Sequence, residues 1–134
     1  MICFKAFSSY AGILLKASIK GINQVFSILN CYGPYTQRLD FWNKVLVDGL
    51  LDLPNLLLTG DLKFTLTFSE VWGSHARTDP LSSYFSQLLT SNSLVDLIQG
   101  SPSSNWRNGR PREEGISKRL DRLSLSNYLL PILS

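Results

Sequence analysis

Residues 56–63 (LLLTGDLK) carry the groups whose type and spacing best fit chemistry. The three leucines and Thr59 predict a short strand that is apolar on both faces, which is typical of a buried strand in a layered sheet. Gly60 lets the backbone turn sharply or approach a ligand. Asp61 then stands at the carboxyl end of that strand, where open α/β sheets place ligand chemistry. The alternative is that Asp61 only ends the strand, in an Asx turn to its own backbone.

The elements before Asp61 alternate between strand and helix. Thr36 is expected to N-cap a helix at 37–52, and Pro54 is expected to stop that helix. Gly33-Pro34 is expected to end the strand at 24–32 that precedes it. This order predicts a layered α/β arrangement. The expected elements are strands at 10–20 and 24–32, a helix at 37–52 and a strand at 56–60.

The second half of the chain is less regular, and its expected elements follow from composition and period. Asp79 with Pro80 is expected to open a second helix that runs to about Leu89. The other expected elements are a long loop at 64–80, a short apolar element at 94–98, a turn-rich link at 100–104, a strand edge at 105–108, a polar loop at 109–115, a half-buried strand at 116–126 and an apolar tail at 129–133.

The composition fits one globular domain with a real core: 134 residues, 44% hydrophobic and 17% charged, with a net charge of +3. The basic balance is compatible with a nucleic-acid partner. Cys3 and Cys31 give neither a disulfide framework nor a zinc spacing, and no Gly-rich phosphate loop or Ser-His-Asp order is present. The start has no signal-peptide pattern and no apolar run reaches membrane length, so we expect no membrane partner and a reducing, intracellular compartment, the nucleus included.

Five short motifs, in order, resemble those of the endonuclease/exonuclease/phosphatase superfamily, most of all the endonuclease domain of LINE-type retroelements. The resemblance covers about residues 13–126. The motifs are Asn30-Cys31-Tyr32-Gly33-Pro34 for "N-x-Y-x-P", Thr59-Gly60-Asp61-Leu62-Lys63 for "GDFN", Leu94-Val95-Asp96 for "L-x-D", Trp106-Arg107-Asn108 for "TW-x-N", and Ser117-Lys118-Arg119-Leu120-Asp121-Arg122 for "S-R-I/L-D-R/Y".

The resemblance implies an α/β fold, a partial two-sheet β-sandwich flanked by helices, and phosphodiester or phosphomonoester cleavage with a divalent ion, usually magnesium. Asp61 would orient or deprotonate the attacking water, and Tyr32 would contact the scissile phosphate. Asp121 would hydrogen-bond a C-terminal histidine. Because Asp61 and Asp121 match motifs that converge on one site, we expect them at the same end of the sandwich.

The chain departs from the family pattern where catalysis depends on it. Lys63 replaces the asparagine of "GDFN", and its ammonium is expected to pair with Asp61 and keep it from acting as a base. No acidic residue precedes Asp40, so the family's metal-binding glutamate is absent and we expect no tightly bound magnesium. The only histidine, His75, lies in the long loop, and no "S-D-H" motif follows Asp121. The sequence is therefore interpreted as one partial domain, 1–134, cut at both ends, with a vestigial catalytic set.

A basic cluster around Trp106 either tracks a phosphate backbone or is a solvated loop partly offset by Glu113 and Glu114. Trp42 and Trp72 are expected to pack in the core or a loop, and Glu70 is expected on the surface. The predicted nucleic-acid-binding residues are Trp106, Arg107, Asn108 and Arg119, and the other basic members are Arg110, Arg112, Lys118 and Arg122.

Three functions follow as hypotheses. The first is a degenerate, inactive endonuclease fragment of retroelement origin. The second is a residual module that binds DNA or RNA weakly, and the third is a nuclease completed by a partner chain. The sequence leaves the oligomeric state open.

Overall fold

The computed structural model describes residues 2–9, 12–97 and 104–133. It contains a six-stranded sheet in the order β1-β2-β3-β4-β9-β6 and a three-stranded sheet in the order β5-β8-β7. The strands are β1 (Ile2–Ser9), β2 (Gly12–Ile19), β3 (Ile22–Tyr32), β4 (Leu56–Asp61), β5 (Val71–Trp72), β6 (Leu94–Asp96), β7 (Trp106–Arg107), β8 (Ser117–Lys118) and β9 (Asp121–Ser126). The helices are α1 (Arg38–Val47), α2 (Ser82–Ser91) and α3 (Leu130–Leu133), with single 3-10 turns η1 (Phe68–Glu70), η2 (Arg112–Glu114) and η3 (Asn127–Leu129).

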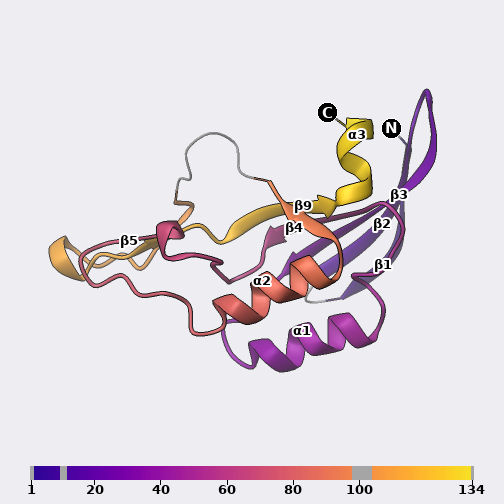
Figure 1. Cartoon of the computed structure of the whole chain (residues 1–134). Helices are drawn as coiled ribbons and strands as arrows, with labels where there is room; N and C mark the ends of the chain where they lie inside the picture. Colours follow the sequence, from indigo (N-terminus) through magenta and orange to yellow (C-terminus); the bar gives the residue numbers. More distant parts are fainter. Residues whose placement is uncertain (1, 10–11, 98–103, 134) are drawn as a thin grey trace.

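The large sheet is layered against helices, as the sequence predicts. Helices α1 and α2 lie side by side along one face of the sheet, and the small sheet forms the far end of the molecule (Figure 1). Strand β4 runs parallel to β3 after the α1 crossover, and β9 is antiparallel between β4 and β6. The chain therefore has the mixed α/β fold with two sheets and flanking helices that was expected. No helix in the described ranges is long and apolar enough to cross a membrane.

Strand β4 is apolar on both faces because it lies between two hydrophobic clusters. Leu56 and Leu58 are fully buried in the main core, which α1 and α2 complete with Trp42 and Phe85. Leu57 packs against the second cluster on the opposite face. The alternation follows from the two-residue period of a strand. The expectation that Trp42 packs in the core is confirmed, since its ring contacts Phe64 and Phe85 edge to face.

Both helices differ from the sequence prediction at their ends. Helix α1 stops at Val47 rather than near residue 52, because Gly49 takes a left-handed turn. Thr36 does not cap it: the N-cap is Gln37, which also has a positive φ. Helix α2 begins at Ser82, two residues after Pro80, and Asp79 instead accepts a hydrogen bond from the Leu81 backbone.

Three other expectations were wrong or incomplete. Residues 116–126 do not form one strand: they divide into β8 of the small sheet and β9 of the large sheet, because the chain passes from one sheet to the other at Arg119 and Leu120. The expected loop at 64–80 contains η1 and β5, and the first residues form β1, a strand that the sequence pattern did not predict. Ile98 and most of the link at 100–104 lie outside the described residues.

A buried cluster of four charges joins the two sheets. Arg119, where the chain leaves β8, donates to Glu70 (2.7 Å) and to Asp96 of β6 (3.0 Å). Arg122 of β9 pairs with the same two carboxylates, at 2.9 Å from Asp96. Glu70 is only 3% exposed, so its expected surface position is wrong. With two cations and two anions, the cluster neutralises itself inside the protein.

Glu70 is held ionised by its partners. Burial alone would raise the pKa of this carboxyl, but hydrogen bonds from Arg122, the Leu66 backbone and Arg119 outweigh burial and lower the pKa below its ordinary 4.5. The stabilisation that this carboxylate provides is therefore present above about pH 4.5 and is lost as pH falls through the lower folded-state value.

Gly60 fixes how closely β3 and β4 approach at their carboxyl ends. Its φ is +118°, and a Cβ built there would lie 2.1 Å from the Cys31 carbonyl oxygen and 2.6 Å from the Asn30 side-chain oxygen. Because only glycine lacks a Cβ, the close approach of the two strands just before Asp61 requires glycine at position 60.

The neighbouring Cys31 thiol is buried, which raises its pKa to about 12 and leaves it no thiolate chemistry at neutral pH.

We expect Glu70→Gln to destabilise the fold strongly, because it leaves two buried guanidinium groups with one carboxylate. The loss should be about 3 kcal/mol or more in urea unfolding at pH 7. Asp48→Asn is the matched control: its exposed pair with Lys44 should contribute no more than about 0.5 kcal/mol. The difference between wild type and Glu70→Gln should shrink below pH 4.5, and a difference independent of pH would contradict the role given to Glu70.

We also expect Gly60→Ala to be costly in the same unfolding assay. Gly49→Ala is the control, because Gly49 likewise has a positive φ but has open space where a Cβ would be added. Both variants bear the backbone penalty, and only Gly60→Ala adds a clash with backbone, so its loss should exceed that of Gly49→Ala by about 2 kcal/mol. Equal losses of stability in the two variants would contradict this role of Gly60, because they would mean that β3 and β4 can move apart at no cost to make room for a Cβ.

Candidate functional site

Three of the predicted catalytic residues lie in one row across the large sheet. In the β3–β4 pairing Tyr32 is opposite Asp61, and in the β4–β9 pairing Asp61 is opposite Asp121. Residues directly opposite in a sheet point to the same face. The expectation that Asp61 and Asp121 lie at the same end is confirmed, while their catalytic roles stay predictions.

Asp61 is held by the residue two positions after it. Its Oδ1 accepts the backbone N–H of Lys63 at 3.3 Å, which is the Asx turn considered as the alternative for this residue. Its Oδ2 accepts a very short charged hydrogen bond from the Lys63 ammonium. Lys63 reaches back because it has left strand geometry, with a φ of +60°. The ion pair expected from the sequence is present.

Two tyrosine rings enclose the Lys63 ammonium. Its Nζ lies 4.5 Å from the ring centroids of both Tyr32 and Tyr35, and the side chain is only 3% exposed. Burial lowers the pKa of Lys63, but hydrogen bonds to Asp61, Tyr35 and Tyr32 and the charge of Asp61 outweigh burial and raise it. Lys63 is thus held as a cation at neutral pH.

The loop that carries Lys63 is anchored by Arg38 at the start of α1. Arg38 forms a two-pronged pair with Asp79, at 2.6 and 2.8 Å, and donates to the Lys63 carbonyl at 3.2 Å. Burial would raise the pKa of Asp79, but Arg38 and the Leu81 backbone outweigh it and lower that pKa. The pair therefore ties α1, the segment after β4 and the approach to α2 into one unit.

The basic cluster predicted to bind nucleic acid divides into paired and exposed members. Arg119 is 8% exposed, and its guanidinium is used by Glu70, Asp96 and the Leu97 carbonyl, so its prediction as a phosphate contact is corrected to a structural role. Arg122 is buried in the same cluster. The Arg112 side chain lies outside the described part of the chain.

Asn108 also has a structural position. Its side-chain oxygen accepts the backbone N–H groups of Arg110 and Ile116, both at 3.1 Å, and its amide nitrogen donates to the Glu114 carbonyl at 2.9 Å. These bonds close the loop at 109–115. The amide therefore shapes the loop, and only its remaining N–H is left for a ligand.

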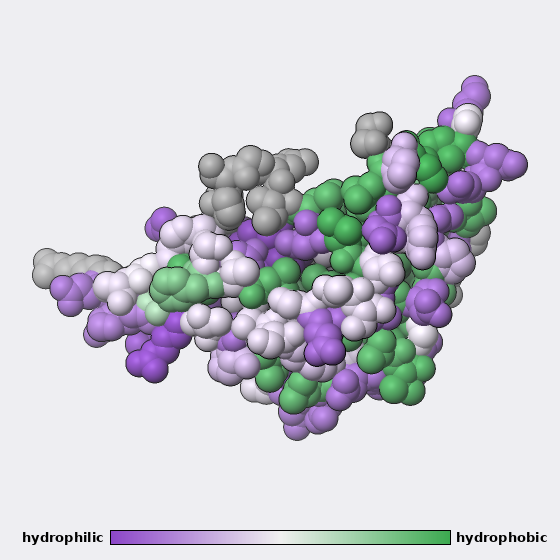
Figure 2. Space-filling model, viewed as in Figure 1, coloured by the Kyte–Doolittle hydropathy of each residue, from purple (hydrophilic) through white to green (hydrophobic). Residues whose placement is uncertain are grey.

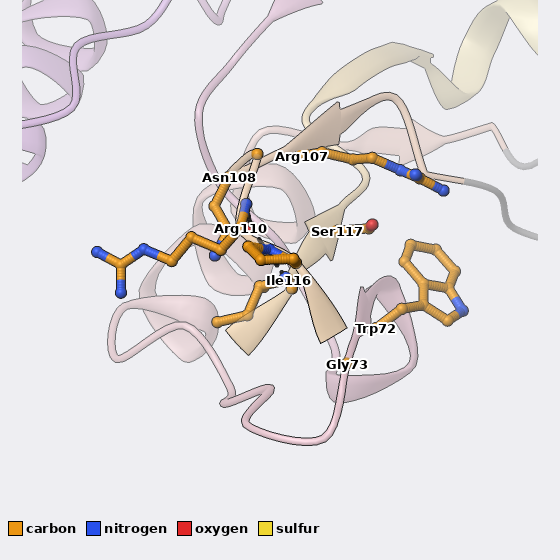
Figure 3. Close-up of a pocket in the computed structure, with 10 residues that line it drawn as sticks. Trp72, Gly73, Arg107, Asn108, Arg110, Ile116 and Ser117 are labelled. Carbon is orange, nitrogen blue, oxygen red and sulfur yellow. Dashed lines mark hydrogen bonds between the residues drawn. The ribbon is translucent and has the colours of Figure 1, made fainter. Parts of the chain in front are cut away.

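Trp106 and Arg107 lie on opposite faces of the small sheet. Trp106 pairs with Lys118, whose Nζ is 5.6 Å from its ring centroid, while Arg107 pairs with Ser117, which is also opposite Trp72. Figure 3 shows Trp72, Ser117 and Arg107 projecting to one side, with Arg110 directed to the other. These residues line an open cavity of about 490 Å³. Trp72 is half-buried there, and hydrophilic residues line the rim of this end of the molecule (Figure 2).

The sequence pattern did not indicate the residues that position Lys63. Tyr35 follows the strand end by three residues, and Arg38 and Asp79 are far apart in sequence, so no local pattern pairs them. His75 is exposed in its loop, as expected. Among the described residues, no group of three or more His, Cys, Asp or Glu side chains is arranged to hold a metal ion.

Solved structures with a similar fold include an endonuclease domain, an exonuclease and a 3' phosphatase. The endonuclease domain of TRAS1, a telomere-specific non-LTR retrotransposon, superposes with a TM-score of 0.74 over 97% of this chain and 57% of its own, at 10% identity. The 3'-5' exonuclease NExo from Neisseria meningitidis has a TM-score of 0.58 over 87% of this chain and 53% of its own, at 14% identity. The 3' phosphatase NExo from Neisseria, bound to a product DNA hairpin, has a TM-score of 0.57 over 87% of this chain and 52% of its own, at 12% identity.

This chain thus spans about half the length of the nucleases that it superposes on. No protein-family model matches the sequence, and no curated protein matches it either. At these identities the likeness establishes a nuclease fold.

Proposed function

We propose that this chain derives from a retroelement-type endonuclease and binds nucleic acid without cleaving it. The observation that carries the proposal is the ion pair between Asp61 and Lys63 at the end of β4. Asp61 occupies the place that the resemblance gives to the catalytic carboxylate. A carboxylate that accepts a short bond from a fixed ammonium is a poor base toward water, because removing the proton from water would require breaking that pair.

The same pair argues against a magnesium ion. Magnesium requires near-octahedral oxygen ligands, and Asp61 already gives one oxygen to the Lys63 ammonium and the other to a backbone N–H. A second positive charge beside Nζ would be repelled. Asp121, the carboxylate opposite, is exposed and could add only a single ligand. The donor set therefore does not fit the metal that the fold family uses.

Binding is supported by the fold and by the charges left on the surface. The Neisseria phosphatase with this fold is bound to a DNA hairpin. In this chain Arg107 is exposed on the same side of the small sheet as the half-buried Trp72, and the exposed Arg110 lines the same cavity. Basic groups together with an aromatic ring are a common platform for single-stranded nucleic acid. The proposed partner is DNA or RNA, held weakly because few cations are free.

The purified chain should not nick plasmid DNA above background with magnesium present. Losing a single electrostatic partner of a transition state commonly costs about a hundredfold or more, and here Lys63 stands where the family motif has asparagine. Lys63→Asn alone should not restore cleavage, because Asp61 and Asp121 still offer too few oxygen ligands for magnesium. The assay compares wild type, Lys63→Asn and Asp61→Ala with and without magnesium. Cleavage by wild type that disappears in Asp61→Ala would show a working enzyme.

Binding should be weak and should fall steeply as salt rises, because phosphate contacts release counterions. Gel-shift titrations of a labelled oligonucleotide at two salt concentrations measure this. Asp61→Ala should bind at least as well as wild type, since it removes a negative charge from the site. Affinity that is absent, or that salt leaves unchanged, would exclude a nucleic-acid-binding module.

A further inference from the structure

A second cavity lies directly beside the Asp61–Lys63 pair. It has a volume of about 350 Å³, within the range of about 300–1,000 Å³ that ligand pockets span. Tyr35 and Lys63 border it on the side of the large sheet, Lys118 of β8 borders it on the side of the small sheet, and the segment from Arg77 to Pro80 closes it. The cavity therefore lies where the two sheets meet, next to the row formed by Tyr32, Asp61 and Asp121.

Cations dominate the lining of this cavity. Arg38, Lys63, Arg77 and Lys118 all line it, against the single carboxylate of Asp79. Two of these cations are already neutralised, since Arg38 pairs with Asp79 and Lys63 pairs with Asp61.

Arg77 and Lys118 remain as the uncompensated charges. Within the described residues neither forms an ion pair, and Lys118 rests near the face of Trp106. A pocket with two such cations attracts an anion, and the hydroxyl of Thr78, an exposed residue of its wall, can donate a hydrogen bond to an anion oxygen.

We propose that this pocket, which we call the Arg77–Lys118 pocket, binds a phosphate group of a nucleic-acid strand without a divalent ion. The proposal rests on the proposed function and adds where the strand is held. The Lys63 ammonium supplies the fixed positive charge next to Asp61, so the carboxylate does not repel the phosphate. Arg77 and Lys118 then contact the phosphate oxygens from the two sides of the cavity.

The geometry favours a phosphate over a neutral or cationic ligand. An arginine offers a planar fork to two oxygens of one phosphate, and a lysine adds a point charge. The Trp106 ring next to Lys118 provides an apolar surface for the attached nucleotide. The two pairs, Arg38–Asp79 and Asp61–Lys63, keep the wall rigid while leaving about two net positive charges toward the cavity.

The test measures fluorescence anisotropy of a labelled single-stranded oligonucleotide with excess EDTA. The variant is Arg77→Gln/Lys118→Gln, which removes both charges and keeps the aliphatic stem beside Trp106. The matched control is Lys20→Gln/Lys44→Gln. It removes the same charge from exposed positions, of which Lys20 lies in the β2–β3 turn at the opposite end of the large sheet. A third variant, Arg107→Gln/Arg110→Gln, removes the cations of the other cavity.

Wild type should bind in EDTA without any need for magnesium, and inorganic phosphate should compete. The pocket variant should lose about tenfold or more in affinity. The plot of log affinity against log salt concentration should also be shallower, by about 0.7 for each phosphate of the single strand that the variant no longer neutralises. The control should stay within about twofold. The proposal for this pocket is wrong if the pocket variant binds as tightly as the control, or if only Arg107→Gln/Arg110→Gln weakens binding. Either result leaves nucleic-acid binding by the protein in place. No binding by wild type overturns the proposed function itself.

Discussion

The pairing of opposite charges inside the fold determines both its stability and what its surface offers. Glu70 and Asp96 hold Arg119 and Arg122 between the two sheets, Asp79 holds Arg38, and Asp61 holds Lys63. Burying any of these cations alone would be prohibitive, so each requires its carboxylate. The small sheet is joined to the large one through the cluster of Glu70, Asp96, Arg119 and Arg122 as well as through the segment between β8 and β9.

This pairing explains why a positive net charge is a poor guide to the binding surface. Of the arginines and lysines near the nuclease-like edge, four are used within the protein. Those left for a ligand are Arg77 and Lys118 on one side of the small sheet and Arg107 and Arg110 around the other cavity. Electrostatic attraction depends on these remaining charges and on their position, because a neutral pair has little field beyond its own length.

The sequence predicted those features of the site that are set by residues close together along the chain. The apolar strand before Asp61 and the pairing of Lys63 with Asp61 are local, and the structure confirms both. Contacts between distant segments were not predictable: Glu70 is 49 and 52 residues from its two arginines, so its sequence context indicated a surface residue. The 116–126 segment was predicted as one strand because its alternating pattern continues across the passage between sheets.

The residue at position 63 affects the electrostatics of the site and leaves the backbone frame unchanged. Strand register alone brings Tyr32, Asp61 and Asp121 into one row, and that register depends on the core around Leu58 and the close contact at Gly60. Neither requirement involves residue 63, so a lysine at that position is compatible with the backbone frame. The lysine determines the electrostatics instead, because its ammonium lies against the Asp61 carboxylate. The rings of Tyr32 and Tyr35 enclose that ammonium. The row of side chains therefore keeps its geometry while the carboxylate of Asp61 is paired with an ammonium.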